Sequence, residues 1–150
     1  MSRVPIAGRG VLELVNVYGR IVQRVEVDNL ITQLGDAHVA DRMSDAGTDA
    51  MSHMAIGTGS GQGSGSQTLA TEAARVALTS KTQGTAGDDN DVIYVATFPA
   101  GTGTGTITEY AIFNAASTGV MFNYASGFSG IGKTADLALT ITHTVTFGSS

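Results

Sequence analysis

The clearest feature of the chain is a strict alternation of apolar and small residues near its carboxyl end. From Leu137 to Phe147 the odd positions carry Leu, Ile, His, Val or Phe, and the even positions carry Ala or Thr. A period of two places all side chains of one set on the same face of a strand. The pattern predicts a long β-strand with an inward row formed by Leu137, Leu139, Ile141, His143, Val145 and Phe147.

Two runs rich in β-branched residues near the amino end predict a hairpin. Val11–Tyr18 and Ile21–Asp28 flank Gly19, as expected for a tight turn between antiparallel strands. In the second run the odd positions are mainly apolar and the even positions are mainly charged. This run therefore predicts a half-buried strand with a charged outer face.

The period changes after the hairpin and predicts one short helix. Apolar residues recur at every third position from Ile31 to Met43. Thr32 is placed to cap a helix that begins near Gln33, because a threonine side chain accepts a hydrogen bond from a free amide of the first turn. The helix is expected to end near Gly47, since glycine often follows the last helical turn.

Shorter strands separated by glycine-rich loops fill the rest of the chain. The predicted strands are His53–Ile56, a strand from about Arg75, Val92–Phe98, Ile107–Phe113 and Val120–Tyr124. The loops between them cover residues 57–66, 82–90 and 101–105. The first loop alternates glycine with polar residues, so we interpret it as a surface loop too flexible to pack. Loops of this length indicate contact with something outside the domain.

These elements predict a mainly β domain over residues 11–150, built as a β-sandwich or a jelly-roll-like barrel with one short helix. Residues 1–10 hold two arginines, one proline and two glycines without periodicity, and are interpreted as an extended amino-terminal arm. Composition supports the all-β prediction. The chain has 20 glycines, and charged residues make up 14% of it, against about 25% in an average protein.

Charge and cysteine content narrow the range of partners. A formal net charge of −5 argues against nucleic acid, whose phosphates require clustered lysine and arginine. Without cysteine, the fold must be stabilised by packing or by partner subunits. No run approaches the roughly 20 apolar residues of a membrane span, and the amino end lacks the apolar run of a secretion signal. We expect a protein made and assembled in the cytoplasm.

One string has the form of a nucleotide-binding motif. Gly127–Thr134 satisfies the phosphate-loop pattern G-x-x-x-x-G-K-[ST] in full. A phosphate loop requires a following helix, whose amino end binds the phosphate groups. Here the long alternating strand follows instead, so we interpret the string as a glycine-rich turn that binds no nucleotide. Lys133 is then expected to be dispensable for stability.

The remaining polar residues predict no reaction site. The three histidines, His38, His53 and His143, lie far apart without the spacing of metal ligands. The string at 88–91 lacks the glycine and the glutamate of a calcium-binding loop, so a solvated turn is expected. Glu109 is interpreted as a buried or interfacial salt-bridge partner, for example of Arg75. We predict no catalytic residue, no metal site and no cofactor, and therefore a protein that is not an enzyme.

Several strings, taken in their order along the chain, resemble small virion proteins of tailed bacteriophages. They are Leu30–Gly35, His53–Gly57, Leu69–Arg75, Tyr94–Pro99, Ile107–Asn114 and Leu137–Val145. The series is similar both to capsid decoration (cement) proteins and to the amino-terminal domain of collar-type tail fibres. It covers about residues 25–147, and its motifs indicate strand order more than chemistry.

The resemblance to decoration proteins implies a β-tulip fold and a homotrimer on the outer surface of the phage head, with the major capsid protein as partner. Collar fibres continue into a long shaft, whereas this sequence ends three residues after its last predicted strand. We therefore expect a decoration protein that is assembled in the host cytoplasm and becomes part of the virion. The alternative is a structural or adaptor protein of the tail fibre or baseplate.

Two sets of residues are predicted to carry these contacts. The arm has no core of its own, so the arm and the first hairpin are expected to touch the capsid or a neighbouring trimer. The candidate residues are Arg3, Arg9, Val11, Val15 and Val17. A monomer with few charges and no disulfide is expected to be marginally stable, which favours packing between subunits. The candidate trimer core or interface is Leu139, Ile141, His143, Val145 and Phe147.

Overall fold

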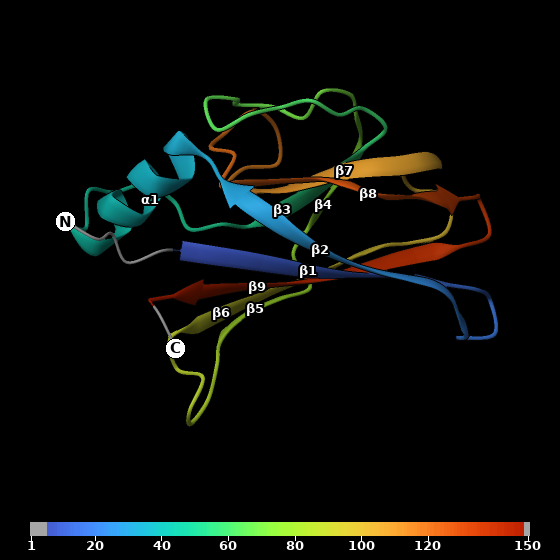
Figure 1. Cartoon of the computed structure of the whole chain (residues 1–150), viewed down its shortest axis with the longest axis horizontal. Helices are drawn as coiled ribbons and strands as arrows, with labels where there is room; N and C mark the ends of the chain where they lie inside the picture. The colour runs from blue at the N-terminus through green and yellow to red at the C-terminus, as the bar shows by residue number, and fades with distance from the viewer. Residues whose placement is uncertain (1–5, 149–150) are drawn as a thin grey trace.

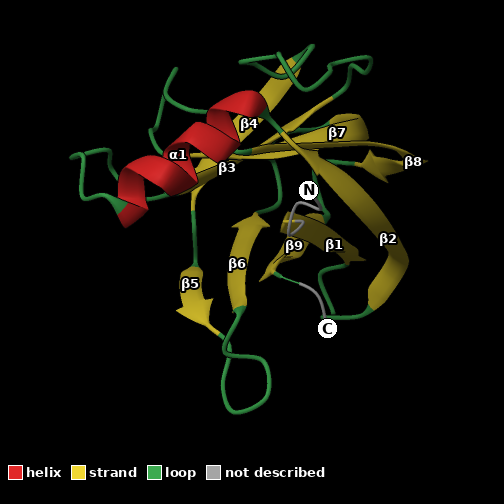
Figure 2. Ribbon diagram, turned by 60° about the vertical axis from the view of Figure 1, so that its left-hand side comes forward, coloured by secondary structure: helices red, strands yellow, loops and turns green. Residues whose placement is uncertain are grey.

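The structure is a computed structural model that describes residues 6–148, and over that range it contains nine strands and one helix (Figure 1). The elements are β1 (Ile6–Val15), β2 (Ile21–Ile31), α1 (Gln33–Met43), β3 (His53–Gly57), β4 (Glu72–Ala77), β5 (Ser80–Gln83), β6 (Asp91–Phe98), β7 (Gly105–Phe113), β8 (Asn123–Lys133) and β9 (Ala138–Phe147). Figure 2 shows the same division by secondary structure. The prediction of a mainly β domain with one short helix is confirmed. No helix within residues 6–148 has the length and apolar character needed to cross a membrane.

The strands form one antiparallel sheet that folds over on itself into two layers. The order is β4-β3-β7-β8-β2-β1-β9-β6-β5. β2 pairs with β1 along most of its length and with β8 through Leu30 and Ile31, so it links the two layers. At the other edge the Leu78 amide donates to Ser52 and the Thr79 amide donates to Val95, so the chain passes from β4 into β5. The two layers are thus connected at both edges, by β2 on one side and by the β4–β5 passage on the other. This arrangement is compatible with the predicted sandwich or tulip-like domain.

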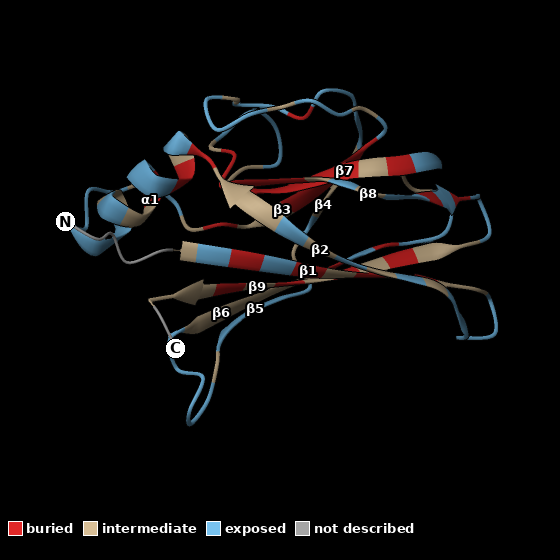
Figure 3. Ribbon diagram, viewed as in Figure 1, coloured by how far each residue is buried: buried red, intermediate tan, exposed pale blue. Residues whose placement is uncertain are grey.

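The main core lies between the layers (Figure 3). β1 and β9 contribute Leu12, Leu14, Leu139, Ile141 and Val145, which face Met54, Ile56, Ile107, Tyr110 and Ile112 of β3 and β7. The alternation in β9 is confirmed, because Leu139, Ile141, His143 and Val145 are buried while the threonines between them stay half-buried.

The glycine-rich loop covers a second, smaller apolar cluster. This cluster lies on the opposite face of the β3–β7–β8 layer and contains Ala55, Leu69, Ala111, Phe113, Met121 and Tyr124. Leu69, from the loop itself, is only 5% exposed, and residues 58–71 run over this layer in Figure 1. Residues 58–66 are mostly exposed, as expected of a surface loop, while hydrogen bonds of the Gly59 amide and carbonyl and the buried Leu69 just beyond them attach this segment to the sheet.

The predicted arm is partly a strand. Ile6–Gly10 forms the first half of β1 and pairs with both β2 and β9, whereas Arg3 lies outside the described residues. Gly8 and Gly10 face inward, and a Cβ at Gly10 would lie 1.8 Å from the Tyr110 hydroxyl oxygen. Glycine is therefore required here for close packing, although in sequence it is typical of a loop.

Helix α1 begins where the sequence predicts and ends earlier. The Thr32 hydroxyl accepts a hydrogen bond from the Gly35 amide at 2.9 Å, which confirms the cap. The last helical residue is Met43, ahead of the predicted end near Gly47. The buried side is formed by Gly35 and His38, while Met43 is 84% exposed. A stripe with a spacing of three drifts by about 60° at each step around an α-helix, so it does not stay on one face.

The string that resembles a phosphate loop lies mainly in β8. Residues 127–133 pair in part with β7, and the next element is β9, so no helix follows, as predicted. The predicted glycine-rich turn is wrong, however, because these residues continue a strand. Lys133 is 1% exposed, and its ammonium donates to the Pro99 carbonyl at 3.0 Å. Because the side chain is buried and bonded, its loss is expected to lower stability, in contrast to the expectation from the sequence.

Candidate interaction surface

Three of the predicted contact residues share one surface, the outer face of the β2–β1–β9–β6–β5 layer. Arg9, Val11 and Val15 occupy alternate positions of β1 and point away from Leu12 and Leu14, which enter the core. The register aligns them with the outward residues of the neighbouring strands. These are Ala138, Thr140, Thr142 and Thr144 of β9, with Ile93, Val95 and Thr97 of β6 beyond them.

Small and uncharged side chains dominate the middle of this outer face. The Thr97 and Thr140 hydroxyls are hydrogen-bonded across the strands at 3.0 Å, and the Thr146 hydroxyl donates to Asp91 at 2.6 Å. A shallow depression of about 450 Å³ lies over β1 and β9 and includes Arg9 and Val11. A surface with short, mutually bonded side chains loses little conformational entropy when another protein packs on it.

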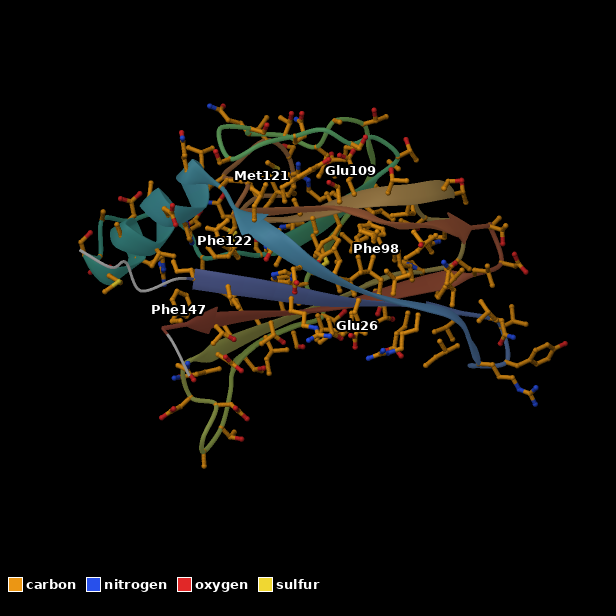
Figure 4. All side chains as sticks on the ribbon, in the orientation of Figure 1. Glu26, Phe98, Glu109, Met121, Phe122 and Phe147 are labelled. Carbon is orange, nitrogen blue, oxygen red and sulfur yellow. The ribbon has the colours of Figure 1, made fainter. Side chains whose placement is uncertain are left out.

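An ionic cluster borders this face on β1 and β2. The guanidinium groups of Arg9 and Arg24 both pair with the Glu26 carboxylate, which is labelled in Figure 4. Hydrogen bonds from Arg9 and then Arg24 hold the pKa of Glu26 below its ordinary value. All three side chains are substantially exposed, so the cluster contributes little to the stability of the chain. The cluster places two cations and one carboxylate at the border of the face, and Glu13 lies between Val11 and Val15 in the outward row of β1.

The tip of the β1–β2 hairpin is apolar and exposed. Val17 is 72% exposed and Tyr18 is 84% exposed, and Ile21 and Val22 on the next strand are each more than half exposed. The Asn16 side chain accepts hydrogen bonds from two amides of the turn, which fixes its backbone. Large apolar side chains gathered on a fixed turn are typical of a protein contact.

Sequence reasoning identified Val17 but missed the rest of this tip. Alternation in β2 placed Ile21 on the buried face, yet the strand extends past the core at this end and leaves the side chain in solvent. Val17 and Tyr18 directly before the predicted turn at Gly19 were a usable signal, because large apolar residues are uncommon in turns that only connect strands.

The other predicted set, on β9, lies in the core of the single chain. Leu139, Ile141, His143 and Val145 are at most 1% exposed and pack against other strands of the same subunit. Phe147 is partly exposed near the end of the strand. Packing inside one chain is therefore sufficient to bury this row, and only Phe147 is available to touch a second subunit.

Glu109 is buried, as predicted, but its partners differ from the expected arginine. Its carboxylate accepts hydrogen bonds from loop amides and from the Tyr124 hydroxyl. Arg75 instead pairs with Glu72 and lies over the Phe113 ring, 3.7 Å from the ring centre. These bonds attach the loop to β7. The Glu109 side chain has no exposed surface, so its carboxylate is not accessible to a substrate.

Within residues 6–148, no group of three His, Cys, Asp or Glu side chains is placed to hold a metal ion.

Comparisons with known proteins give no relative, since no family model, curated protein or solved structure matches the chain. The likeness to phage virion proteins consequently rests on the sequence strings alone. The features that bear on function are the outer face of the sheet and the apolar hairpin tip.

Proposed function

We propose that this protein is a capsid decoration protein of a tailed bacteriophage, which binds the outer surface of the head as a homotrimer and stabilises the capsid lattice. The observation that carries the proposal is the exposed apolar hairpin tip, which adjoins a broad outer face of small residues. Val17, Tyr18, Ile21 and Val22 supply the kind of apolar anchors that dominate binding energy at protein interfaces.

The mechanism is bridging of neighbouring capsid subunits. A trimer presents three hairpin tips and three outer faces, so it can hold several capsid proteins at once. Detaching one capsid edge then requires several contacts to break together, and the linked contacts act at a high effective concentration. The capsid is stabilised against internal pressure although each single contact is weak.

The hairpin and the face suit different parts of such an interface. The tip projects beyond the sheet at the end of the molecule opposite α1 (Figure 1), so it can enter a depression on a partner. The outer face of the sheet is broad and adjoins the tip, and Arg9 and Arg24 lie at its border. Apolar anchors surrounded by polar contacts are the usual composition of a specific interface.

Imaging of virions tests the location. Particles that lack this protein are mixed with purified wild-type protein and compared by electron microscopy with untreated particles. Decoration of the head surface supports the proposal, and added density at the tail or baseplate supports the tail-protein alternative instead. Absence of binding to either structure would overturn both.

A matched pair of variants tests the tip. Tyr18→Ser combined with Ile21→Ser removes two exposed apolar anchors, and each lost anchor is expected to cost about 1–2 kcal/mol of binding. Occupancy on heads should drop at least tenfold. The control is Met43→Ser on α1, which removes an equally exposed apolar side chain from the other end of the molecule. Equal occupancy for both variants would show that the tip does not bind.

A further inference from the structure

An open pocket lies at the end of the molecule opposite the hairpin tip. Its volume is about 590 Å³, which is within the range of small-molecule sites. The lining comes from α1, the segment before β3 and the adjoining ends of strands: His38, Val39, Arg42, Met43, Ala50, Met51, Lys81, Tyr94, Phe122 and Phe147. Figure 4 shows Phe122 and Phe147 beside α1. We refer to it as the α1 pocket.

The lining of the α1 pocket is mainly apolar, and its only ionised groups are cationic. Arg42 and Lys81 line it, and no Asp or Glu does. This is unusual for a chain with a net charge of −5. Neither cation forms an ion pair with another residue between positions 6 and 148.

Both cations keep donors available for a ligand. Arg42 donates one bond to the Thr48 carbonyl at 3.0 Å, and Lys81 donates one to the Met51 carbonyl at 3.0 Å. These bonds fix the side chains beside the pocket. A guanidinium has five donor hydrogens and an ammonium has three, so each group can still bind an anion.

His38 adds an unpaired polar group to the same lining. Its side chain is 6% exposed and packs edge-on against Phe122, with the ring centres 6.5 Å apart. Its Nδ1 has no hydrogen-bond partner in the described part of the chain. Burial lowers the pKa of His38 below its ordinary value, which favours the neutral ring at neutral pH. Buried polar atoms without a partner are rare, and they occur where a ligand or water completes the site.

We propose that the α1 pocket binds a small apolar carboxylate, with the apolar body against Met51, Tyr94 and Phe147 and the carboxylate at Arg42 and Lys81. An apolar body is required because most of the lining is apolar. An anionic group is favoured because the charged lining consists of two cations and no carboxylate. This site does not depend on capsid binding, which we assign to the opposite end of the molecule.

The natural methionines allow a direct test with decanoate as the probe. In protein labelled at the methionine methyl groups, decanoate is expected to shift the resonances of Met43 and Met51, which line the pocket. Met54 and Met121 are fully buried and do not line the pocket, so their resonances serve as internal controls. Shifts confined to Met54 and Met121, or no shifts at millimolar decanoate, would overturn the proposal.

Two comparisons test the need for charge. 1-Decanol has the same chain without the carboxylate, and acetate has the carboxylate without the chain, so both should bind at least tenfold more weakly than decanoate. Arg42→Gln should weaken decanoate about tenfold, as expected for loss of a charge-assisted hydrogen bond, and should leave decanol unchanged. Arg20→Gln, at the far hairpin, is the matched control. Equal affinity of decanoate and decanol would show an apolar pocket without carboxylate recognition.

Discussion

His143 and Tyr110 form a hydrogen-bonded pair between the two layers. The Tyr110 hydroxyl lies 2.6 Å from Nδ1 of His143, and neither side chain has exposed surface. Burial lowers the pKa of His143 to about 3 and raises the pKa of Tyr110 above its ordinary value. Gly8 and Gly10 of β1 leave the space that these two rings occupy. The imidazole therefore stays neutral where an exposed histidine would take up a proton.

Acid is expected to destabilise the protein through His143. In the unfolded chain the imidazole takes up a proton near its ordinary pKa of 6.5, whereas the folded chain keeps it neutral down to about pH 3. The unfolded state binds more protons in this window, so the free energy of unfolding falls as the pH falls. The full pKa shift of His143 corresponds to a decrease of at most about 5 kcal/mol in the free energy of unfolding.

Urea unfolding at neutral pH and at about pH 4 measures this effect. His143→Gln should lose less stability than the wild type between the two conditions, although its stability at neutral pH is lower. His53→Gln is the control, because that side chain is only half-buried. If the free energy of unfolding of His143→Gln falls between neutral pH and pH 4 as much as that of the wild type, His143 is not the source of the acid sensitivity.

At the scale of elements, the glycine-rich loop is ordered by a single carboxylate. Glu109 Oε1 accepts from the amides of Gly59 and Thr71, at 3.2 and 2.8 Å. Oε2 accepts from the amide of Ala70 at 3.0 Å and from the Tyr124 hydroxyl at 2.5 Å. Both ends of the loop are thus held at one point of β7. A buried carboxylate requires such donors, because it is costly without them.

Glu109→Gln is expected to release the loop. A glutamine of the same shape keeps one acceptor oxygen and replaces the other with an NH₂ group, which cannot accept from a backbone amide, so at least one of the three loop amides loses its acceptor. The free energy of unfolding should fall by about 2–4 kcal/mol. Hydrogen exchange at the Ala70 or Thr71 amide should accelerate more than exchange in β9, which is distant from the loop.

Glu72→Gln is the matched control for this substitution. Glu72 lies beside the same loop, but its side chain is 39% exposed, and it pairs with Arg75, whose side chain is 9% exposed. Glu72→Gln should cost less than Glu109→Gln, about 1 kcal/mol, because glutamine keeps one acceptor oxygen at a solvent-exposed position and Arg75 keeps its bonds to the Ala115 and Thr118 carbonyls. Equal effects of the two substitutions would show that Glu109 has no special role in holding the loop.

At the scale of the whole molecule, the core and the outer face of the sheet have separate roles. Ile141 faces the interior and has no exposed surface, and Val11 on the adjacent β1 faces outward and is half-buried. Substitutions at the two positions therefore separate folding from assembly. The homotrimer remains a prediction that this separation can test.

Ile141→Asp is expected to unfold the subunit, because an unpaired carboxylate in the core costs several kcal/mol. Val11→Asp should keep the β-sheet spectrum in circular dichroism, since its side chain reaches solvent. If the outer face binds neighbours, Val11→Asp should reduce binding to capsids while the chain stays folded. Light scattering then reports the oligomer for each variant. A folded Ile141→Asp subunit would contradict the arrangement of the core.

Features that depend on neighbours along the chain were predictable from the sequence. The alternation from Leu139 to Val145 determined both the strand and its buried face, because successive side chains of a strand point to opposite sides. The β1–β2 hairpin and the Thr32 cap were also predictable, because each depends only on residues close together in the sequence. A turn or a cap is formed by residues within a few positions of one another.

The tertiary structure decided the features that depend on residues far apart in sequence. Glycine is required at positions 8 and 10 of the strand because the side chains of Asn29 and His143 approach Gly8 and that of Tyr110 approaches Gly10. Glu109 binds amides of a loop about 40 to 50 residues away, and Lys133 reaches the Pro99 carbonyl across the fold. No local pattern encodes these pairings. The sequence determined where strands form and which side of each is apolar, whereas the folding of the sheet into two layers decided which polar groups meet and which apolar residues stay exposed.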